Sequence, residues 1–227
     1  GSHFIQNYIK TYYSLRIFIL QLLINNVCEL TVSKNGHNVI CCCIEYYPPS
    51  LTTFILYELS CDIDKYVKHK FGYRVIIGMI AHFPPYLIND FIESILINID
   101  CYCKDIFGHY IIQQIIEHTT DQSQYNYKIQ IFMYLIDNCE LLVDTPTICS
   151  VYVTAIQYAN YQYKDMLFTK IKENSNVVIS IFSSNYGKDL SKYLYKYFGY
   201  YVLYSTITSN LSADNKKVIF AALSRIT

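Results

Sequence analysis

The chain has 227 residues, of which 52% are hydrophobic and 16% are charged. This composition excludes a disordered chain and a coiled coil, and 7 Gly with 5 Pro are too few for a sandwich of short strands. The 18 basic and 18 acidic residues cancel overall, yet residues 161–227 carry nine basic side chains against four acidic ones. We therefore expect any phosphate-binding surface toward the C-terminal end, and we disfavour a protein that grips nucleic acid by charge alone.

Several classes of function lack their sequence signals. The nine cysteines show no metal-binding spacing, so they are interpreted as reduced thiols, and no cofactor or metal is expected. The best apolar stretch, Leu15 to Ile24, is interrupted by Arg16 and Gln21 and is about half the length of a membrane span. No triad spacing or phosphate loop is present, and acidic pairs such as Asp62 and Asp64 suit helix starts. We do not expect an enzyme.

A period of 36 residues organises the chain. SLRIFILQLLINNVCELTVSKNG (14–36) aligns with SLTTFILYELSCDIDKYVKHKFG (50–72) and with YLINDFIESILINIDCYCKDIFG (86–108). A fourth copy runs from Tyr127 to Ser150 with Cys149 in place of the final glycine, and a looser fifth copy ends at Gly187. We call this final position the slot and count the following residues as +1, +2 and so on. The predicted slots are Gly36, Gly72, Gly108, Cys149 and Gly187.

Each period predicts three helices. After the third slot, Ile111, Ile112, Ile115 and Ile116 form one apolar stripe, which recurs after the first two slots. Double prolines then start the next helix, and a short helix such as 63–69 completes the unit. Three helices for each 36 residues predict an all-α fold, a right-handed α-solenoid in a single domain spanning residues 1–227. Capping helices are expected over about 198–227, with Ser212 as the N-cap of a helix over 213–225.

The segments that follow the slots resemble one known repeat. FGHYIIQQIIEH (107–118) resembles the second helix of a Pumilio (PUF) repeat, with the pattern YGNYVIQxxLEH. FGYRVIIGMIAH (71–82) and NGHNVICCCIEY (35–46) resemble variants of it, and NYGKDLSKYL (185–194) is similar to the last repeat of the family. The resemblance covers residues 5–194. The family normally has eight repeats, whereas this chain holds about five.

The resemblance implies single-stranded RNA on a concave face, with about one base for each repeat. In the family, the +1 and +5 residues hydrogen-bond a base edge and the +2 residue stacks on bases. Carried over to this chain, these positions are His37, Asn38 and Cys41; Tyr73, Arg74 and Ile77; His109, Tyr110 and Gln113; Ser150, Val151 and Thr154; and Lys188, Asp189 and Lys192.

The third set alone keeps a workable pair. Gln113 offers a donor and an acceptor, His109 is the second partner and Tyr110 is the stacking group, which resembles a uridine reader. Elsewhere Arg74 keeps a stacking guanidinium, but Ile77 cannot hydrogen-bond a base and Cys41 is at best a weak donor. Lys188 and Lys192 are expected to contact phosphate. We expect one or two bases to be read by sequence.

Three hypotheses for function remain. The first is a Pumilio-type module that binds U-containing single-stranded RNA and regulates messenger RNA translation or decay. The second resembles the nucleolar PUF-like proteins of ribosome assembly, and there Lys188, Lys192, Lys196, Lys216 and Lys217 would dominate non-specific binding. The third is a protein-binding solenoid in which Cys41, Ile77 and Val151 suit an apolar partner. We expect a monomer, a possible protein partner on the convex face, no membrane contact and a cytoplasmic location, with the nucleus or nucleolus as the alternative.

Overall fold

The computed structural model describes residues 2–12, 16–119, 125–185, 187–199, 203–204, 209 and 211–225, and within these ranges the regular elements are all helices. Contacts divide the chain into two compact units, Gly1–Tyr127 (unit 1) and Lys128–Thr227 (unit 2). Each unit is described by itself, and the single domain expected from the sequence stays a prediction. None of the described helices has the length and apolar character that a membrane span needs.

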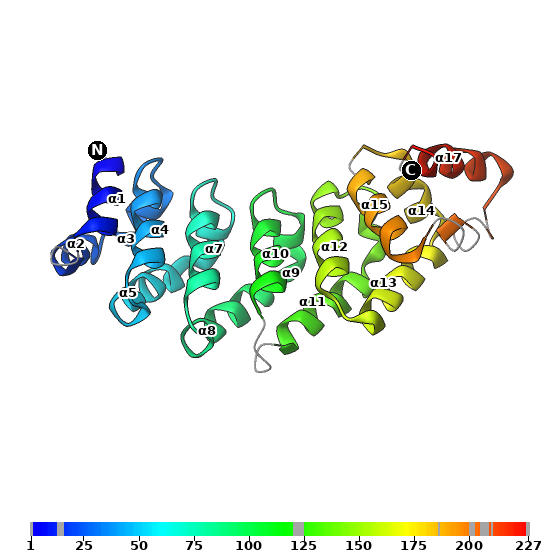
Figure 1. Ribbon diagram of the computed structural model, residues 1–227. Coiled ribbons are helices and arrows are strands. Elements are labelled where there is room, and N and C mark those ends of the chain that lie inside the picture. The colour runs from blue at the N-terminus through cyan, green and yellow to red at the C-terminus, as the bar shows by residue number, and fades with distance from the viewer. Residues whose placement is uncertain are drawn as a thin grey trace. The chain divides into compact units, whose positions relative to one another are not determined.

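Unit 1 repeats a three-helix motif, and the third helices of the motifs stand side by side in one row (Figure 1). This row contains α1 (Ser2–Thr11), α4 (Gly36–Tyr46), α7 (Gly72–His82) and α10 (Gly108–His118). The first helices are α2 (Arg16–Leu23), α5 (Pro49–Leu59) and α8 (Pro85–Leu96). The short second helices are α3 (Val27–Val32), α6 (Ile63–Val67) and α9 (Ile99–Lys104), with the 3-10 turn η2 (Ser60–Asp62) before α6. The predicted three helices for each period are confirmed.

The core of unit 1 follows the predicted apolar stripe. Positions +3, +4, +7 and +8 are buried in α4, α7 and α10, and in α10 all four isoleucines are fully inaccessible. Steps of three and four residues keep these side chains on one helix face, where they pack against neighbouring helices. The +1, +2 and +5 side chains lie on the opposite side of each of these helices.

The slot glycines allow a close approach between two backbone segments. A Cβ added at Gly36, Gly72 or Gly108 would lie 2.6, 2.5 or 2.9 Å from the carbonyl oxygen of the residue six positions earlier. Such distances are shorter than any real Cβ contact, so only glycine lets each long helix begin directly against the short helix before it.

The slot N–H groups are capped from three residues earlier. Side chains of Ser33, His69, Asp105 and Ser184 accept the N–H of Gly36, Gly72, Gly108 and Gly187 at 3.3, 3.3, 2.8 and 3.2 Å. The helix start would otherwise leave these donors unpaired. His69 accepts through Nδ1, which also receives the N–H of Phe71 at 3.2 Å, so the imidazole is neutral with Nδ1 unprotonated.

Unit 2 continues the pattern less regularly. The helix α11 (Tyr125–Asp137) runs across the division between the units and is followed by η4 (Cys139–Leu142), α12 (Pro146–Tyr158), α13 (Tyr161–Glu173), α14 (Ser175–Ser183), α15 (Lys188–Phe198) and α17 (Ala213–Leu223). In Figure 1, α17 lies beside α14. The Ser212 hydroxyl accepts the Asn215 N–H at 3.4 Å, which confirms the predicted N-cap of the last helix. The all-α solenoid fold is confirmed.

Candidate nucleic-acid interface

The +1, +2 and +5 residues of α4, α7 and α10 form one surface, which we call the reading face. Its three positions differ in burial in a regular way. At +1, His37 and His109 are buried and Tyr73 is half-buried, whereas all three +2 residues are exposed and all three +5 residues are half-buried. The +2 and +5 side chains are therefore the ones that a ligand meets first.

The +1 rings of the first two repeats stack against the next repeat. His37 lies 4.7 Å from the ring of Phe71, with the planes 10° apart. Tyr73 lies 5.4 Å from Phe107 at 18° and 5.5 Å from Tyr110 at 26°. These are the offset, near-parallel geometries that aromatic pairs favour. Phe71 and Phe107 immediately precede the slots, so these two stacks, which we call the aromatic ladder, join the first repeat to the second and the second to the third.

His37 does not match the role that the resemblance implies for it. Its Nδ1 lies 2.9 Å from the Ser33 carbonyl oxygen, and its Nε2 is buried without a hydrogen-bond partner in the described structure. The ring is only 4% exposed. The side chain packs between repeats, and its burial disfavours the expected hydrogen bond from His37 to a base, which stays a prediction.

In the third repeat His109 is almost as buried, at 6% exposed, but it lies beside an exposed tyrosine and a half-buried glutamine. His109 Nδ1 lies 2.9 Å from the Asp105 carbonyl oxygen, and burial lowers the pKa of His109, which favours the neutral ring at pH 7. A neutral ring that faces a carbonyl through Nδ1 donates from Nδ1, so its Nε2 carries a lone pair. The His109 ring lies 3.9 Å from that of Tyr110, which is 44% exposed. Gln113 is half-buried one turn further along α10.

The second repeat presents a cation on an aromatic ring. Arg74 is exposed, its Nε donates to the Tyr73 hydroxyl at 3.3 Å, and its guanidinium carbon lies 5.7 Å from the centre of the Tyr73 ring. Tyr73 thus holds a flat cationic group at the surface. The +5 residue, Ile77, adds only apolar area. In the first repeat, burial raises the pKa of Cys41 to about 12, so its thiol is neutral.

The register predicted for the fourth repeat is wrong by one residue. Val151 is fully buried and Thr154 is 4% exposed, so neither faces a ligand. The helix α12 ends at Tyr158, and the buried residue after it is Ala159. In the first three repeats the helix ends at +10 and a buried residue follows at +11, which are the positions of Tyr47, Phe83 and Thr119. The same count places the fourth slot at Ile148.

With the slot at Ile148, the core positions and the +1 and +5 positions of the fourth repeat follow the burial pattern of the others, whereas its +2 residue is less exposed than theirs. Cys149 is then the buried +1 residue, Ser150 the half-buried +2 residue and Val153 the half-buried +5 residue. The Cys149 thiol points toward the Leu142 carbonyl at 4.0 Å, and burial raises its pKa to about 12. The sequence argument missed this register because it sought a small residue at the slot. The shift shows in the structure through the burial of Val151 and Cys149.

The fifth repeat carries charge at the reading positions. Lys188, Asp189 and Lys192 are all exposed, and the Lys192 ammonium lies 3.4 Å from Asp189 Oδ1. Leu190 and Leu194 occupy the core positions +3 and +7, so the slot predicted at Gly187 fits. No base-reading pair is formed there.

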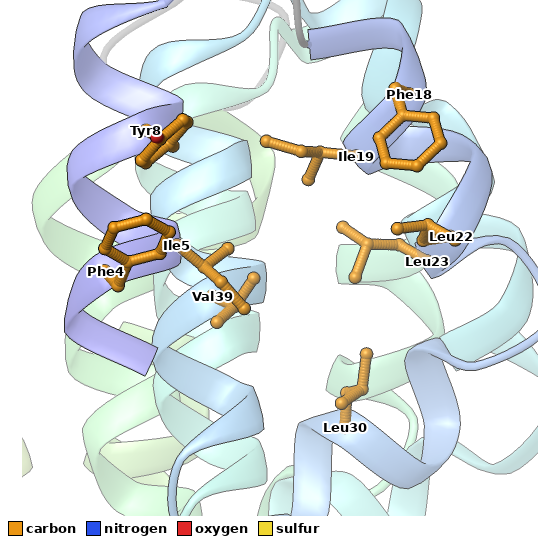
Figure 2. A pocket seen from close by; sticks show the side chains of 9 residues that line it. All are labelled: Phe4, Ile5, Tyr8, Phe18, Ile19, Leu22, Leu23, Leu30 and Val39. Atoms are coloured by element: carbon orange, nitrogen blue, oxygen red, sulfur yellow. The ribbon is translucent and has the colours of Figure 1, made fainter. Parts of the chain in front are cut away.

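An apolar groove of about 350 Å³ opens between α1 and α2 (Figure 2). Phe4, Ile5 and Tyr8 of α1 line one wall, and the other wall includes Phe18 and Leu22 of α2, which are each 59% exposed. None of its lining residues is charged. Its chemistry is therefore unlike that of the reading face. Among the described residues, no three His, Cys, Asp or Glu side chains gather in a way that could hold a metal ion.

A family model described as the Pumilio-family RNA binding repeat matches residues 26–60 and 98–125. These ranges contain the slots Gly36 and Gly108 and the whole of α4 and α10. The resemblance to Pumilio repeats is therefore confirmed. Comparison with the curated proteins gives no significant match.

Solved Pumilio-type structures share the fold of the chain. PUF-8 in complex with PBE-RNA matches with a TM-score of 0.84 and 16% identity over 99% of this chain and 68% of PUF-8. The Puf3 RNA binding domain bound to site B of the Cox17 RNA matches with a TM-score of 0.85 and 19% identity, over 100% of this chain and 70% of the Puf3 chain. Yeast Puf5p bound to SMX2 RNA matches with a TM-score of 0.73 and 14% identity, over 99% of this chain and 67% of the Puf5p chain. At these identities the likeness shows the fold, an α-solenoid of Pumilio type.

Proposed function

We propose that this chain binds single-stranded RNA on the reading face and thereby regulates messenger RNA translation or decay. The observation that carries the proposal is the exposed line of Arg74, Tyr110 and half-buried Gln113 over an aromatic ladder. Flat rings and a guanidinium offer stacking to any base, and an amide offers two hydrogen bonds to a base edge. The match to the Pumilio repeat model and the RNA-bound state of the solved relatives support this proposal.

We infer that the reading face recognises a single base by its sequence. His109 Nε2 can accept the N3–H of uracil while the Gln113 amide donates to a uracil oxygen, with Tyr110 beside the base. His37 is withdrawn into packing, Tyr73 stacks within the ladder, and Ile77 has no polar atom, so the first two repeats contribute stacking and little sequence information. The chain then reads one uridine and holds the neighbouring bases by their faces.

The test is the affinity of a U-containing RNA at physiological salt, measured by fluorescence anisotropy. The double variant Tyr110→Ala, Gln113→Ala should bind about 10- to 100-fold more weakly, because base stacking contributes about 1–3 kcal/mol for each base. Tyr86→Ala removes an 80% exposed tyrosine from α8, outside the reading face, and should bind as the parent does. Unchanged affinity in the double variant would overturn the proposal.

A second candidate function is non-specific RNA binding of the ribosome-assembly type. It is favoured by exposed lysines of unit 2, among them Lys188 and Lys192 on α15 and Lys217 on α17. Binding of this kind weakens steeply with salt, because each neutralised phosphate releases a counterion. A steep salt slope that is reduced in Lys→Gln variants of unit 2, with no effect of Tyr110→Ala, would select it. A protein-binding role, a partner on the convex face, a monomeric state and the cytoplasmic location stay predictions.

A further inference from the structure

Unit 2 contains a cavity of about 360 Å³ between α14, α15 and the last helix, α17. Three basic residues line it: Lys188 and Lys192 from the first turns of α15, and Arg225 just after the end of α17. Polar residues at the end of α14, in the segment that follows it and in α15 complete the wall, namely Ser183, Ser184, Asn185 and Ser191. Residues from two segments far apart in sequence thus bring three exposed positive charges to one partly open pocket.

The hydroxyl groups of this wall already use their protons. Ser183 donates to the Ile179 carbonyl at 2.5 Å, Ser184 to the Ser180 carbonyl at 2.6 Å and Ser191 to the Lys188 carbonyl at 2.8 Å. Donors toward a ligand must therefore come from the two ammonium groups, the guanidinium and the Asn185 amide. Such a set suits an acceptor-only anion.

The charge in and around the cavity indicates which anion. The three cations that line the cavity have one acidic neighbour, Asp189, whose Oδ1 lies 3.4 Å from the Lys192 ammonium. Asp189 does not itself line the cavity. Three positive charges and one negative charge leave a balance of +2. A phosphate diester in a nucleic-acid backbone carries −1, whereas a phosphate monoester carries about −1.5 to −2 at pH 7. A monoester dianion therefore balances the cavity better than a backbone phosphate.

We propose that this cavity, the α15–α17 pocket, binds a phosphate monoester, and that its ligand is the terminal phosphate of an RNA strand. The identity of that ligand rests on the function proposed above, whereas the site itself rests on the cavity and its cations. The Arg225 guanidinium can contact two phosphate oxygens in a fork, and the lysines act as point charges. The C-terminal segment then has a role besides following the repeats, because the residues directly after α17 supply Arg225.

The experiment compares one U-containing RNA in three forms, with a 5′-phosphate, with a 3′-phosphate and with hydroxyl groups at both ends. All three are measured on the full chain at constant ionic strength. A phosphate at one of the two ends should tighten binding about tenfold, as expected for charge-assisted hydrogen bonds. The double variant Lys188→Gln, Arg225→Gln should lose this gain, so that it binds the three forms of the RNA with the same affinity. Lys196→Gln, an exposed residue of α15 that does not line the pocket, should keep the gain.

A second measurement separates the pocket from the RNA-binding proposal. Inorganic phosphate alone should raise the melting temperature of the parent and of Lys196→Gln, but not that of the double variant, with sulfate-free chloride buffer as the reference. Equal affinity for all three RNAs, or a phosphate gain that persists in the double variant, would overturn the proposed ligand. Stabilisation by phosphate without any RNA binding would support the pocket while contradicting the RNA end and the function proposed above. Absence of both effects would overturn the pocket itself.

Discussion

The first three repeats carry glycine at the slot and the fourth does not, and this difference changes where the long helix begins. Gly36, Gly72 and Gly108 let the helix start against the short helix before it, and a side chain caps the slot N–H. Ile148 stands at the fourth slot as a buried side chain, α12 starts two residues earlier at Pro146, and the N-cap Thr145 gives no side-chain hydrogen bond. Where the long helix begins against the backbone of the short helix before it, glycine marks the slot in the sequence. Where a side chain such as that of Ile148 stands at the slot, the position is recognised only from the burial of the residues that follow.

The largest effect is expected from testing the fourth register. Val151→Asp places a carboxylate in the fully buried core of unit 2, and we expect a loss of about 3 kcal/mol or more in the free energy of unfolding. Val153→Asp makes the same change at the half-buried +5 position and should cost under about 1 kcal/mol. Urea denaturation of both variants measures this. Equal losses, or a larger loss for Val153→Asp, would restore the slot at Cys149.

Two glycines of one helix sharpen the account of the slot. Gly72→Ala forces a methyl group toward the Tyr66 carbonyl, 2.5 Å away, and should destabilise the chain by about 1–3 kcal/mol. Gly78 lies inside α7, and an added Cβ there meets only Ile44 Cγ2 at 4.0 Å. Gly78→Ala should stabilise the chain by about 0.5–1 kcal/mol, because alanine is the better helix former. Thermal unfolding that shows the same sign for both variants would contradict the close-approach argument.

The caps differ in pH sensitivity, since the second repeat uses a histidine where the third uses an aspartate. Burial lowers the pKa of His69, and protonation removes the Nδ1 lone pair that accepts the Phe71 and Gly72 N–H groups. A histidine with a lowered pKa in the folded state binds protons more readily when unfolded, so its contribution to stability is lost as the pH falls below about 6.5. His109, whose pKa is also lowered by burial, acts in the same direction.

We therefore expect His69→Asp to reduce the loss of stability between pH 7.5 and 5.5 by about 1 kcal/mol. Asp105 shows that an aspartate fits this capping position. His82→Asn removes an exposed histidine from the end of α7 and should leave the pH dependence unchanged. Urea titrations at the two pH values measure the free energy of unfolding of each variant. If this free energy falls by the same amount between pH 7.5 and 5.5 in His69→Asp as in the parent, the cap does not depend on pH.

The smallest effect is expected at His37. Because its Nε2 is buried and its ring stacks on Phe71, His37→Phe should keep the stack and change RNA affinity less than about twofold. Gln113→Ala should lower the affinity for the same RNA. A loss in His37→Phe as large as that in Gln113→Ala would mean that the +1 residue of the first repeat reads a base after all.

The periodic features of this sequence predict the fold. The packing of individual side chains, which the period does not contain, decides the burial of His37, the register of the fourth repeat and the pocket in unit 2. Glycine spacing, double prolines and the isoleucine stripe of α10 predict the repeats, and Ser212 predicts the last helix. The fate of His37 depends on Phe71 in the next repeat, a contact that no single repeat contains. The error at Val151 and Thr154 arose because Cys149 is small like glycine, whereas the structure tolerates Ile148. The α15–α17 pocket joins Lys188 to Arg225 across 37 residues and has no local motif.

The most direct test of the reading face is a selection from randomised single-stranded RNA at physiological salt, run in parallel on the parent and on Gln113→Ala. We predict that the parent enriches RNAs with one strongly specified uridine between positions of weak preference, and that Gln113→Ala loses this uridine while still binding RNA. A motif of three or more consecutive specified bases, or the same uridine in the Gln113→Ala pool, would contradict a face on which the third repeat alone reads sequence.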